Sequence, residues 1–224
     1  MNSIKKTAII LGASGLTGGL LLDRLIGDER YQTIKLFSRS RIDGLPNKVH
    51  QHIGNLLALD QFKNEFTADE MYCCIGTTAK KTPDKERYKA IDYGIPVAAA
   101  KLSKENGIKT FIVVSAMGAN KKSSVFYNRT KGEMEQGVLD QGIQKTAILR
   151  PSLIGGNRDE RRVLEKIGLV VFKIIQPLFI GPLKKYKIVN ADCIAQAMLN
   201  IANTTSNTNV IITSDDIKQL AKTT

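Results

Sequence analysis

The residues most able to do chemistry lie in the second half of the chain, where a serine, a tyrosine and a lysine follow one another. Ser115 directly follows the apolar run 111–114. Tyr127 and Lys131 are four positions apart, which places them on one face if the segment is helical. An ammonium group beside a tyrosine hydroxyl favours the phenolate form. We therefore expect proton transfer at Tyr127, with the Ser115 hydroxyl on the substrate oxygen. Taken alone, the same spacing fits a solvated helix face, so its meaning depends on the rest of the chain.

A glycine-rich turn near the start of the chain predicts an anion site. The apolar run 7–11 reads as a buried strand, followed by the turn 12–19 (GASGLTGG) and a leucine-rich helical pattern. Glycines at 12, 15 and 18 permit a tight turn and the close approach of a pyrophosphate to the amides that begin the helix. The spacing departs from the G-x-G-x-x-G fingerprint, and no lysine follows as a phosphate-loop NTPase requires. A glycine turn without a ligand is the alternative.

Length and composition agree with one enzyme-sized domain. The chain has 224 residues, of which 42% are hydrophobic, and we expect a single domain over 1–224 with 151–190 as a substrate-side insert. The polar start 1–6 lacks the apolar region of a secretory signal, and no long uncharged apolar run occurs, so we expect a cytoplasmic location. The three cysteines lack C-x-x-C spacing, which favours buried free thiols.

The net charge of +12 is spread along the chain in short clusters such as 80–81, 121–122 and 184–185. No basic helix interleaved with aromatic residues and no nucleic-acid motif is present, so we expect no nucleic-acid partner. A positive field of this kind attracts phosphorylated ligands. His50 and His52 alternate on one predicted strand without an evident third ligand, so we expect no metal site.

Strand-like and helix-like segments alternate, which predicts an α/β fold with a doubly wound parallel sheet. Pro96 falls inside one predicted helix and either kinks it or marks its first turn, with Asp92 as a possible cap upstream. The expected strands are 7–11, 33–38, 49–53, 70–75, 110–115, 144–149 and 209–213, and the helical stretches after the first are 56–66, 88–106, 124–141 and 192–202.

Ligands of a doubly wound sheet bind beyond the carboxyl ends of its strands, and the polar residues above all lie at such ends. The second strand ends in Ser38 and Arg39, where an NAD site carries an acidic residue for the ribose 2′-hydroxyl. A guanidinium group binds a phosphate bidentately, so this position favours a cofactor with a 2′-phosphate. A solvated basic loop is the alternative for Arg39.

Several motifs in this order resemble a known family over about residues 5–203. They are the glycine turn, Cys74-Ile75-Gly76-Thr77-Thr78, Ser115-Ala116-Met117-Gly118-Ala119, Tyr127-x3-Lys131-Gly132-Glu133 and Leu149-Arg150-Pro151. Together they resemble the atypical short-chain dehydrogenases/reductases, in the NAD(P)H-binding subgroup similar to the human Tat-interacting oxidoreductase.

The resemblance implies an NAD(P)-binding Rossmann fold, NADPH as cofactor and a catalytic set of Ser115, Tyr127 and Lys131. Lys131 would also touch the nicotinamide ribose. Many relatives have Gly-Asp where this chain has Gly54-Asn55, so Asn55 either contacts the adenine less well or hydrogen-bonds locally. The implied cofactor residues are Gly12, Ser14, Gly15, Leu16, Thr17 and Gly18 for the pyrophosphate, Arg39 for the 2′-phosphate, and Cys74, Ile75, Gly76 and Thr77 near the ribose and nicotinamide, together with Ser38, Asn55, Lys131, Arg150 and Pro151.

Two functions follow as alternatives. The first is an NADPH-dependent reductase of a small carbonyl or quinone-like substrate, in which Tyr127 protonates the oxygen and Lys131 lowers the tyrosine pKa. The second is an NADPH-binding regulator or scaffold with little catalysis. The short chain after Arg150 predicts a small substrate or a shallow pocket. The segment 157–183 is expected either to cover the active-site mouth or, through 167–183, to contact a membrane surface or a partner protein.

Overall fold

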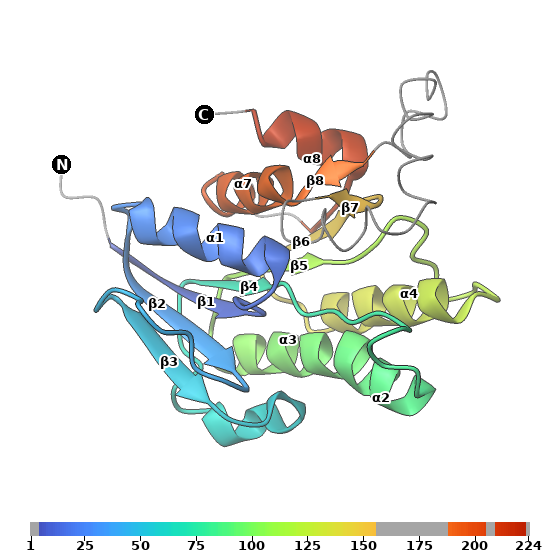
Figure 1. Ribbon diagram of the computed structural model, residues 1–224, viewed down its shortest axis with the longest axis horizontal. Helices are drawn as coiled ribbons and strands as arrows, with labels where there is room; N and C mark the ends of the chain where they lie inside the picture. Colours follow the sequence, from blue (N-terminus) through green and yellow to red (C-terminus); the bar gives the residue numbers. More distant parts are fainter. Residues whose placement is uncertain (1–4, 156–187, 205–208, 223–224) are drawn as a thin grey trace.

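The computed structural model describes residues 5–155, 188–204 and 209–222. Their main element is a seven-stranded sheet with the order β3-β2-β1-β4-β5-β6-β9, in which all neighbouring strands are parallel. The chain runs outward from β1 to β3 and then returns to the other side of β1 as β4 (Figure 1). The strands are β1 Lys6–Leu11, β2 Tyr31–Ser38, β3 Val49–Ile53, β4 Glu70–Cys73, β5 Thr110–Val114, β6 Lys145–Arg150 and β9 Val210–Thr213.

The central strands are apolar on both faces, as parallel strands that are covered on both sides must be. In β1, Ala8 and Ile10 belong to one buried cluster, and Ile9 and Leu11 belong to the other. This division follows from strand geometry, since successive side chains point to opposite faces. All four are fully buried. The predicted doubly wound parallel sheet is confirmed.

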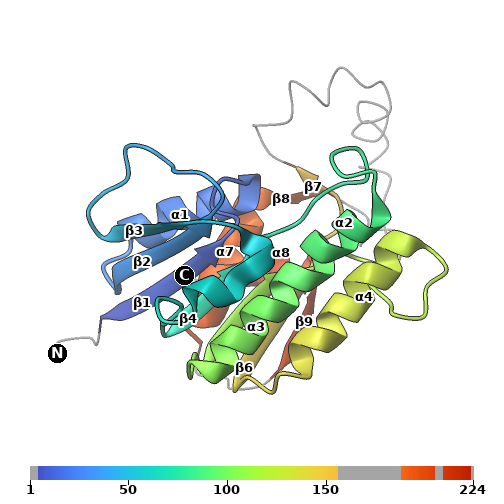
Figure 2. The same cartoon turned by 90° about the horizontal axis from the view of Figure 1, so that it is seen from below.

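Helices form a layer on each face of the sheet, which Figures 1 and 2 show from two directions. The first helix packs against the helix that follows β8, and the apolar residues of both belong to one core cluster. On one face lie α1 Leu16–Gly27, α7 Ala191–Ala202 and α8 Ser214–Leu220; on the other lie the 3₁₀ helix η1 Leu56–Phe62 and the helices α2 Lys85–Lys89, α3 Ile95–Glu105 and α4 Phe126–Leu139.

The predicted helix 88–106 is interrupted. The π-helical segment η2 Ala90–Gly94 separates α2 from α3, and Pro96 lies in the first turn of α3. Proline is tolerated there because the amides of a first helical turn have no partner inside the helix. Asp92 is not the helix cap that the sequence suggests, because it lies inside the π segment. Such wide turns are frequent at functional sites.

Several other predicted elements are shorter than expected. Strand β4 ends at Cys73 rather than residue 75, because the backbone beyond Cys74 leaves the sheet and the Thr77 amide donates to the Asp92 carboxylate. The stretch 56–66 forms a 3₁₀ helix only to Phe62. Strand β5 ends at Val114, so Ser115 follows the strand.

Beyond β6 the chain forms a second, two-stranded sheet of β7 Ile154–Gly155 and β8 Val189–Asn190. Most of the expected insert 151–190, and the whole of 157–183 with its two alternative roles, lie outside the described residues. Within the described part of the chain, no helix is both long and apolar enough to cross a membrane.

Candidate active site

The glycine turn after β1 is shaped by close backbone contacts. Gly12 has a φ of +89°, a left-handed value that disfavours a side chain. A Cβ on Gly18 would lie 2.2 Å from the Gly12 carbonyl oxygen, and one on Gly12 would lie 2.8 Å from the carbonyl carbon of Cys74. The first turn of α1 therefore packs directly on the end of β1, beside the end of β4. Gly15 is exposed at the N-cap of α1, so the amides that begin this helix can bind an anion.

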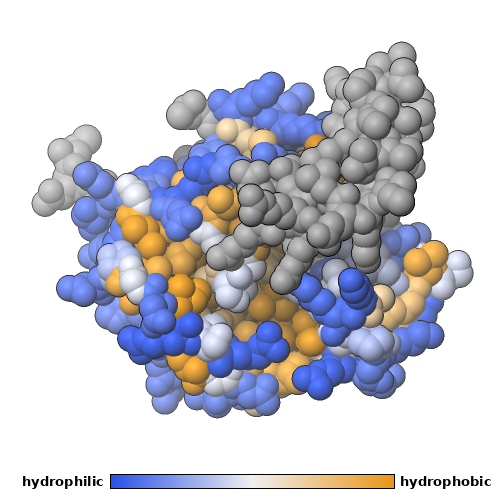
Figure 3. Space-filling model, in the orientation of Figure 1, coloured by the Kyte–Doolittle hydropathy of each residue, from blue (hydrophilic) through white to orange (hydrophobic). Residues whose placement is uncertain are grey.

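The turn lies at the switch point between β1 and β4, where ligands of doubly wound sheets bind. The space-filling view shows apolar residues in a hollow between α1 and α3, with hydrophilic residues around it (Figure 3). Of the predicted cofactor residues, Ser14, Gly15, Arg39, Asn55 and Gly76 are exposed, Gly12, Leu16, Cys74, Ile75, Thr77 and Arg150 are partly buried, and Thr17, Gly18, Ser38, Lys131 and Pro151 are buried.

The ends of β2 and β3 differ in how their polar residues are used. The Ser38 hydroxyl donates to the Ser40 carbonyl oxygen at 2.7 Å. Arg39 is exposed, and no hydrogen bond or ion pair of its side chain occurs within the described residues. The Asn55 side chain accepts a hydrogen bond from the Leu57 amide at 3.0 Å as the cap of η1. Of the two alternatives for Asn55, an adenine contact and a local hydrogen bond, the structure shows the local hydrogen bond. The guanidinium of Arg39, in contrast, is available to a ligand.

The proton-transfer pair lies on α4, in the order the sequence predicts. Lys131 is 4% exposed and Tyr127 is 41% exposed. The Lys131 ammonium lies 2.8 Å from Oδ1 of Asp92, which is fully buried in η2. Oδ2 of Asp92 accepts the Thr77 amide hydrogen at 2.7 Å. The lysine of the predicted catalytic set therefore has a buried counter-ion that also holds the chain after β4.

The surroundings of Tyr127 favour the protonated form of its hydroxyl. Desolvation raises the pKa of its hydroxyl, and the Asp92 charge raises it further, while the Lys131 charge lowers it. The net direction is upward. The Lys131 charge lowers the pKa of Tyr127, as expected, but desolvation and the Asp92 charge together outweigh it, so the pKa lies above its usual value. At neutral pH the hydroxyl carries its proton and can give it to an oxygen.

Ser115 is engaged in a different contact from the one expected. Its side chain is buried and donates a hydrogen bond to Oε1 of Glu135 at 2.5 Å. Glu135 in turn accepts from Nε and Nη2 of Arg150 at 2.9 and 2.5 Å. The pair is bidentate and buried on the glutamate side. This network ties β5 and β6 to α4, and a role for Ser115 on a substrate stays a prediction.

Asp92 and Glu135 are the two site residues that sequence reasoning missed. Tyr127, Lys131 and Glu135 are each four positions apart, so the sequence did carry a signal that Glu135 shares their helix face. No comparable signal pointed to Asp92, which comes from another element. A loop also packs closely on this helix: a Cβ on Gly132 would lie 2.2 Å from the Lys121 amide nitrogen.

Comparison with curated proteins finds clear relatives. The chain is 32% identical over 161 residues to Protein FMP52, mitochondrial, of Debaryomyces hansenii, a match that covers 69% of each chain. It is 31% identical over 161 residues to Protein HTATIP2 of Rattus norvegicus, which covers 70% of this chain and 66% of that protein. The match to protein fmp52 of Aspergillus niger extends over 198 residues at 30% identity and covers 85% and 84% of the two chains.

Solved structures show the same fold at low sequence identity. The Bordetella bronchiseptica enzyme WbmG in complex with NAD superposes with a TM-score of 0.69 at 11% identity, covering 98% of this chain and 77% of that one. UDP-glucose 4-epimerase of Thermotoga maritima gives a TM-score of 0.68 at 16% identity, with 96% and 81% covered. No model of a known protein family matches the chain.

These relatives correct one expectation. The cytoplasmic location expected from the sequence is contradicted, because the relatives from Debaryomyces hansenii, Candida albicans and Aspergillus niger are named as mitochondrial proteins. The expectation depended on a polar start and on the lack of a long apolar run. Neither feature distinguishes the compartments inside a cell.

The seven-stranded parallel sheet flanked by helices agrees with the fold of these solved structures. The identity of 32% over 69% of each chain is sufficient to show common membership. The chain belongs to the family of Protein FMP52 and Protein HTATIP2, and it is an atypical short-chain dehydrogenase/reductase with a Rossmann-like NAD-binding fold.

Proposed function

We propose that the protein is an NADPH-dependent oxidoreductase that reduces a small carbonyl or quinone-like substrate. The observation that carries this proposal is the placement of Tyr127, a protonated tyrosine with an exposed ring, on the same helix face as the buried ammonium of Lys131. Both lie at the edge of the sheet where its parallel strands end. A proton donor at this edge is what the reduction of a carbonyl oxygen needs.

The residues at this edge suit a dinucleotide cofactor. The tight contacts among Gly12, Gly18 and Cys74 leave no room for side chains beside the amides that begin α1, so a pyrophosphate can approach the backbone there. Arg39 is exposed and unpaired within the described residues, as a 2′-phosphate ligand should be before binding. The segment 74–77 would line the ribose and nicotinamide, beside the Lys131 ammonium.

In the proposed reaction, the residues at this edge would hold a nicotinamide cofactor, whose chemistry when bound would be hydride transfer to the carbonyl carbon. Tyr127 donates its proton to the carbonyl oxygen, which becomes the hydroxyl of the product. Lys131 hydrogen-bonds ribose hydroxyls and stabilises the tyrosinate left after the transfer. Ser115, Glu135 and Arg150 fix the position of α4 against the ends of β5 and β6.

One observation favours a second function. The Ser115 hydroxyl is bound to Glu135 and buried, so it is not free to orient a substrate as the catalytic set requires. An NADPH-binding regulator with weak catalysis would need the cofactor site and Arg39 but no such serine. This alternative shares the cofactor residues with the first and differs only in turnover.

A paired assay separates the two functions. Cofactor binding is measured by calorimetry and by the fluorescence of NADPH itself, which is convenient because the chain has no tryptophan. Turnover is measured as NADPH oxidation with a panel of aldehydes, ketones and quinones. Binding with turnover supports the reductase, and tight binding without turnover on any class supports the regulator. Absence of NADPH and NADH binding would overturn both.

A further inference from the structure

The pair formed by Lys131 and Asp92 is the most deeply buried ion pair in the described part of the chain. The lysine side chain is 5% exposed and the aspartate side chain 1%, and the two charged atoms are 2.8 Å apart. Removing two charges from water costs more free energy than an ordinary contact returns. A pair kept at this depth therefore calls for a reason beyond stability.

Asp92 connects three parts of the site. It lies in the π-helical segment η2, it contacts Lys131 on α4, and its second oxygen holds the Thr77 amide after β4. Without the wide π turn, one unbroken helix would run from α2 to α3. One carboxylate thus fixes the lysine relative to the segment proposed to line the nicotinamide.

Lys131 has hydrogen-bonding capacity to spare. An ammonium group has three N–H donors, and within the described residues Lys131 has Asp92 as its single partner. The other deeply placed lysine, Lys145, donates to the Ile201 and Thr204 carbonyl oxygens and the Thr204 hydroxyl. A Cβ on Gly76 would lie 3.9 Å from the Lys131 nitrogen and 3.7 Å from Oδ1 of Asp92, so a side chain at this position would point toward the pair.

We propose that Asp92 is a positioning residue that holds the Lys131 ammonium in place for the ribose hydroxyls of the dinucleotide, and that Gly76 keeps the way to that ammonium open. The inference rests on the proposed function, since the ligand of Lys131 is the cofactor. Asp92 itself touches neither cofactor nor substrate in this account. It acts through Lys131, so the test asks whether substitution of Asp92 has any effect once Lys131 has been removed.

The test is a double-mutant cycle on NADPH affinity at neutral pH, measured by calorimetry well below the melting temperature. Asp92→Asn keeps the size of the side chain and an acceptor for the Thr77 amide but loses the charge. We expect Asp92→Asn and Lys131→Met each to weaken binding roughly 10- to 100-fold, the range of a charge-assisted hydrogen bond. In the double variant, affinity should equal that of Lys131→Met within about twofold, because Asp92 acts only through the lysine.

Three results would overturn the proposal. They are unchanged affinity in Asp92→Asn, losses that add in the double variant, and recovery of affinity in Asp92→Asn when only its stability is restored by solutes. If Asp92→Asn does not fold, Asp92→Glu replaces it, since it keeps the charge and displaces the carboxylate; it should also bind NADPH more weakly, and wild-type affinity would reject the inference.

Gly76 gives an independent arm of the test. Its position is not left-handed and a Cβ there meets only ordinary contacts, so Gly76→Ala should fold normally and should weaken NADPH binding less than a larger side chain does. Gly76→Val places two methyl groups toward the pair and should weaken binding roughly 10-fold or more, by the scale of a lost charged hydrogen bond. Equal affinities of the two variants would count against the open path. A wild-type protein that binds no NADPH would instead overturn the proposed function.

Discussion

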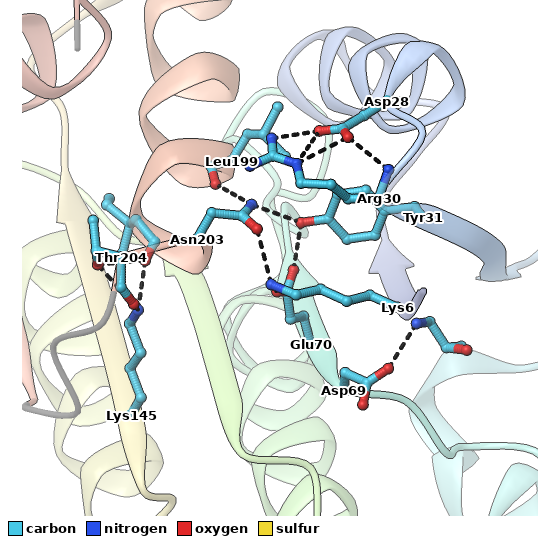
Figure 4. A network of polar contacts seen from close by, with 12 residues as sticks. Lys6, Asp28, Arg30, Tyr31, Asp69, Glu70, Lys145, Leu199, Asn203 and Thr204 are labelled. Carbon is cyan, nitrogen blue, oxygen red and sulfur yellow. Dashed lines mark hydrogen bonds and ion pairs between the residues drawn. The ribbon is translucent and has the colours of Figure 1, made fainter. Parts of the chain in front are cut away.

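The parallel strands all begin at one side of the sheet, the amino edge, and all end at the other, the carboxyl edge. Each of these edges holds a buried carboxylate paired with a lysine, but the two pairs differ in how many of their hydrogen-bonding atoms have partners. At the amino edge, Glu70 accepts from Lys6 at 2.6 Å, from the Tyr31 hydroxyl at 2.7 Å and from the Tyr72 hydroxyl at 2.6 Å. Figure 4 shows Lys6, Tyr31 and Glu70 of this cluster, together with Asn203, which accepts from Lys6 and donates to the Tyr31 hydroxyl. At the carboxyl edge, Lys131 has Asp92 alone among the described residues.

The difference indicates different roles. Lys6, Tyr31 and Glu70 are the first residues of β1, β2 and β4, and Asn203 ends α7, so their contacts join three strands and a helix. The Glu70 carboxylate accepts three hydrogen bonds within the protein, and a buried carboxylate satisfied in this way serves stability. A buried cation with unused donors keeps capacity for binding. Paired substitutions at the two edges test this distinction.

The largest effect is expected for the tyrosine of the carboxyl edge. Tyr127→Phe removes the proton donor and should lower turnover of a verified substrate roughly 100- to 10,000-fold, with NADPH affinity near wild type. The matched control is Tyr31→Phe at the amino edge, which should lower thermal stability and leave turnover unchanged. Reduction by Tyr127→Phe at the wild-type rate would show that Tyr127 is no acid and favour the regulator.

Removing the amino-edge charge should affect stability alone. Glu70→Gln leaves Lys6 without its counter-ion and two buried hydroxyls with a weaker acceptor, so we expect the free energy of unfolding to fall by about 2–3 kcal/mol in denaturant titrations. NADPH affinity should stay within about twofold of wild type, in contrast to Asp92→Asn. A loss of affinity as large as that of Asp92→Asn would erase the distinction between the edges.

The arginines form another matched pair. Arg39→Ala should weaken NADPH roughly 10- to 150-fold and leave NADH nearly unchanged, since charge-assisted bonds to a 2′-phosphate contribute about 1.5–3 kcal/mol. Arg30 at the amino edge is paired with Asp28, and because the Arg30 side chain is exposed to solvent, Arg30→Ala should lower stability by only about 1 kcal/mol and leave both affinities unchanged. Calorimetry with the two cofactors measures both. Equal losses for NADPH and NADH would reject the 2′-phosphate role.

The smallest effect concerns alkaline pH. Burial and the nearby Glu70 charge raise the pKa of Tyr31, and burial chiefly raises that of Tyr72. Above pH ~10 the unfolded chain loses these protons while the folded chain keeps them, so the free energy of unfolding should fall by up to about 1.4 kcal/mol per pH unit for each tyrosine. In Tyr31→Phe, the free energy of unfolding should fall less steeply with pH. Buried Cys73, whose pKa is raised to about 11, contributes equally to both proteins and cancels. Parallel slopes would contradict the raised pKa of Tyr31.

Most of the fold follows from local patterns. Apolar runs bounded by turns predicted the seven strands of the main sheet to within two residues at each end, because strand formation there depends on burial of consecutive side chains. The glycine turn was predictable because positive φ and close packing at Gly12 and Gly18 exclude other residues. The π segment before Pro96 was not, since a proline permits either a kink or a first turn and tertiary packing chooses between them.

The candidate site also has a part that the sequence predicts and a part that it does not. The sequence by itself placed Tyr127 and Lys131 on one helix face, because a spacing of four residues is fixed by helix geometry. The partners of these residues come from elements far apart in the chain, and only the tertiary structure brought Asp92 to Lys131 and Glu135 to Ser115. The resulting charges, desolvation and hydrogen bonds decide whether a tyrosine is an acid and whether a serine is free, and these depend on distances in space that no spacing along the sequence encodes.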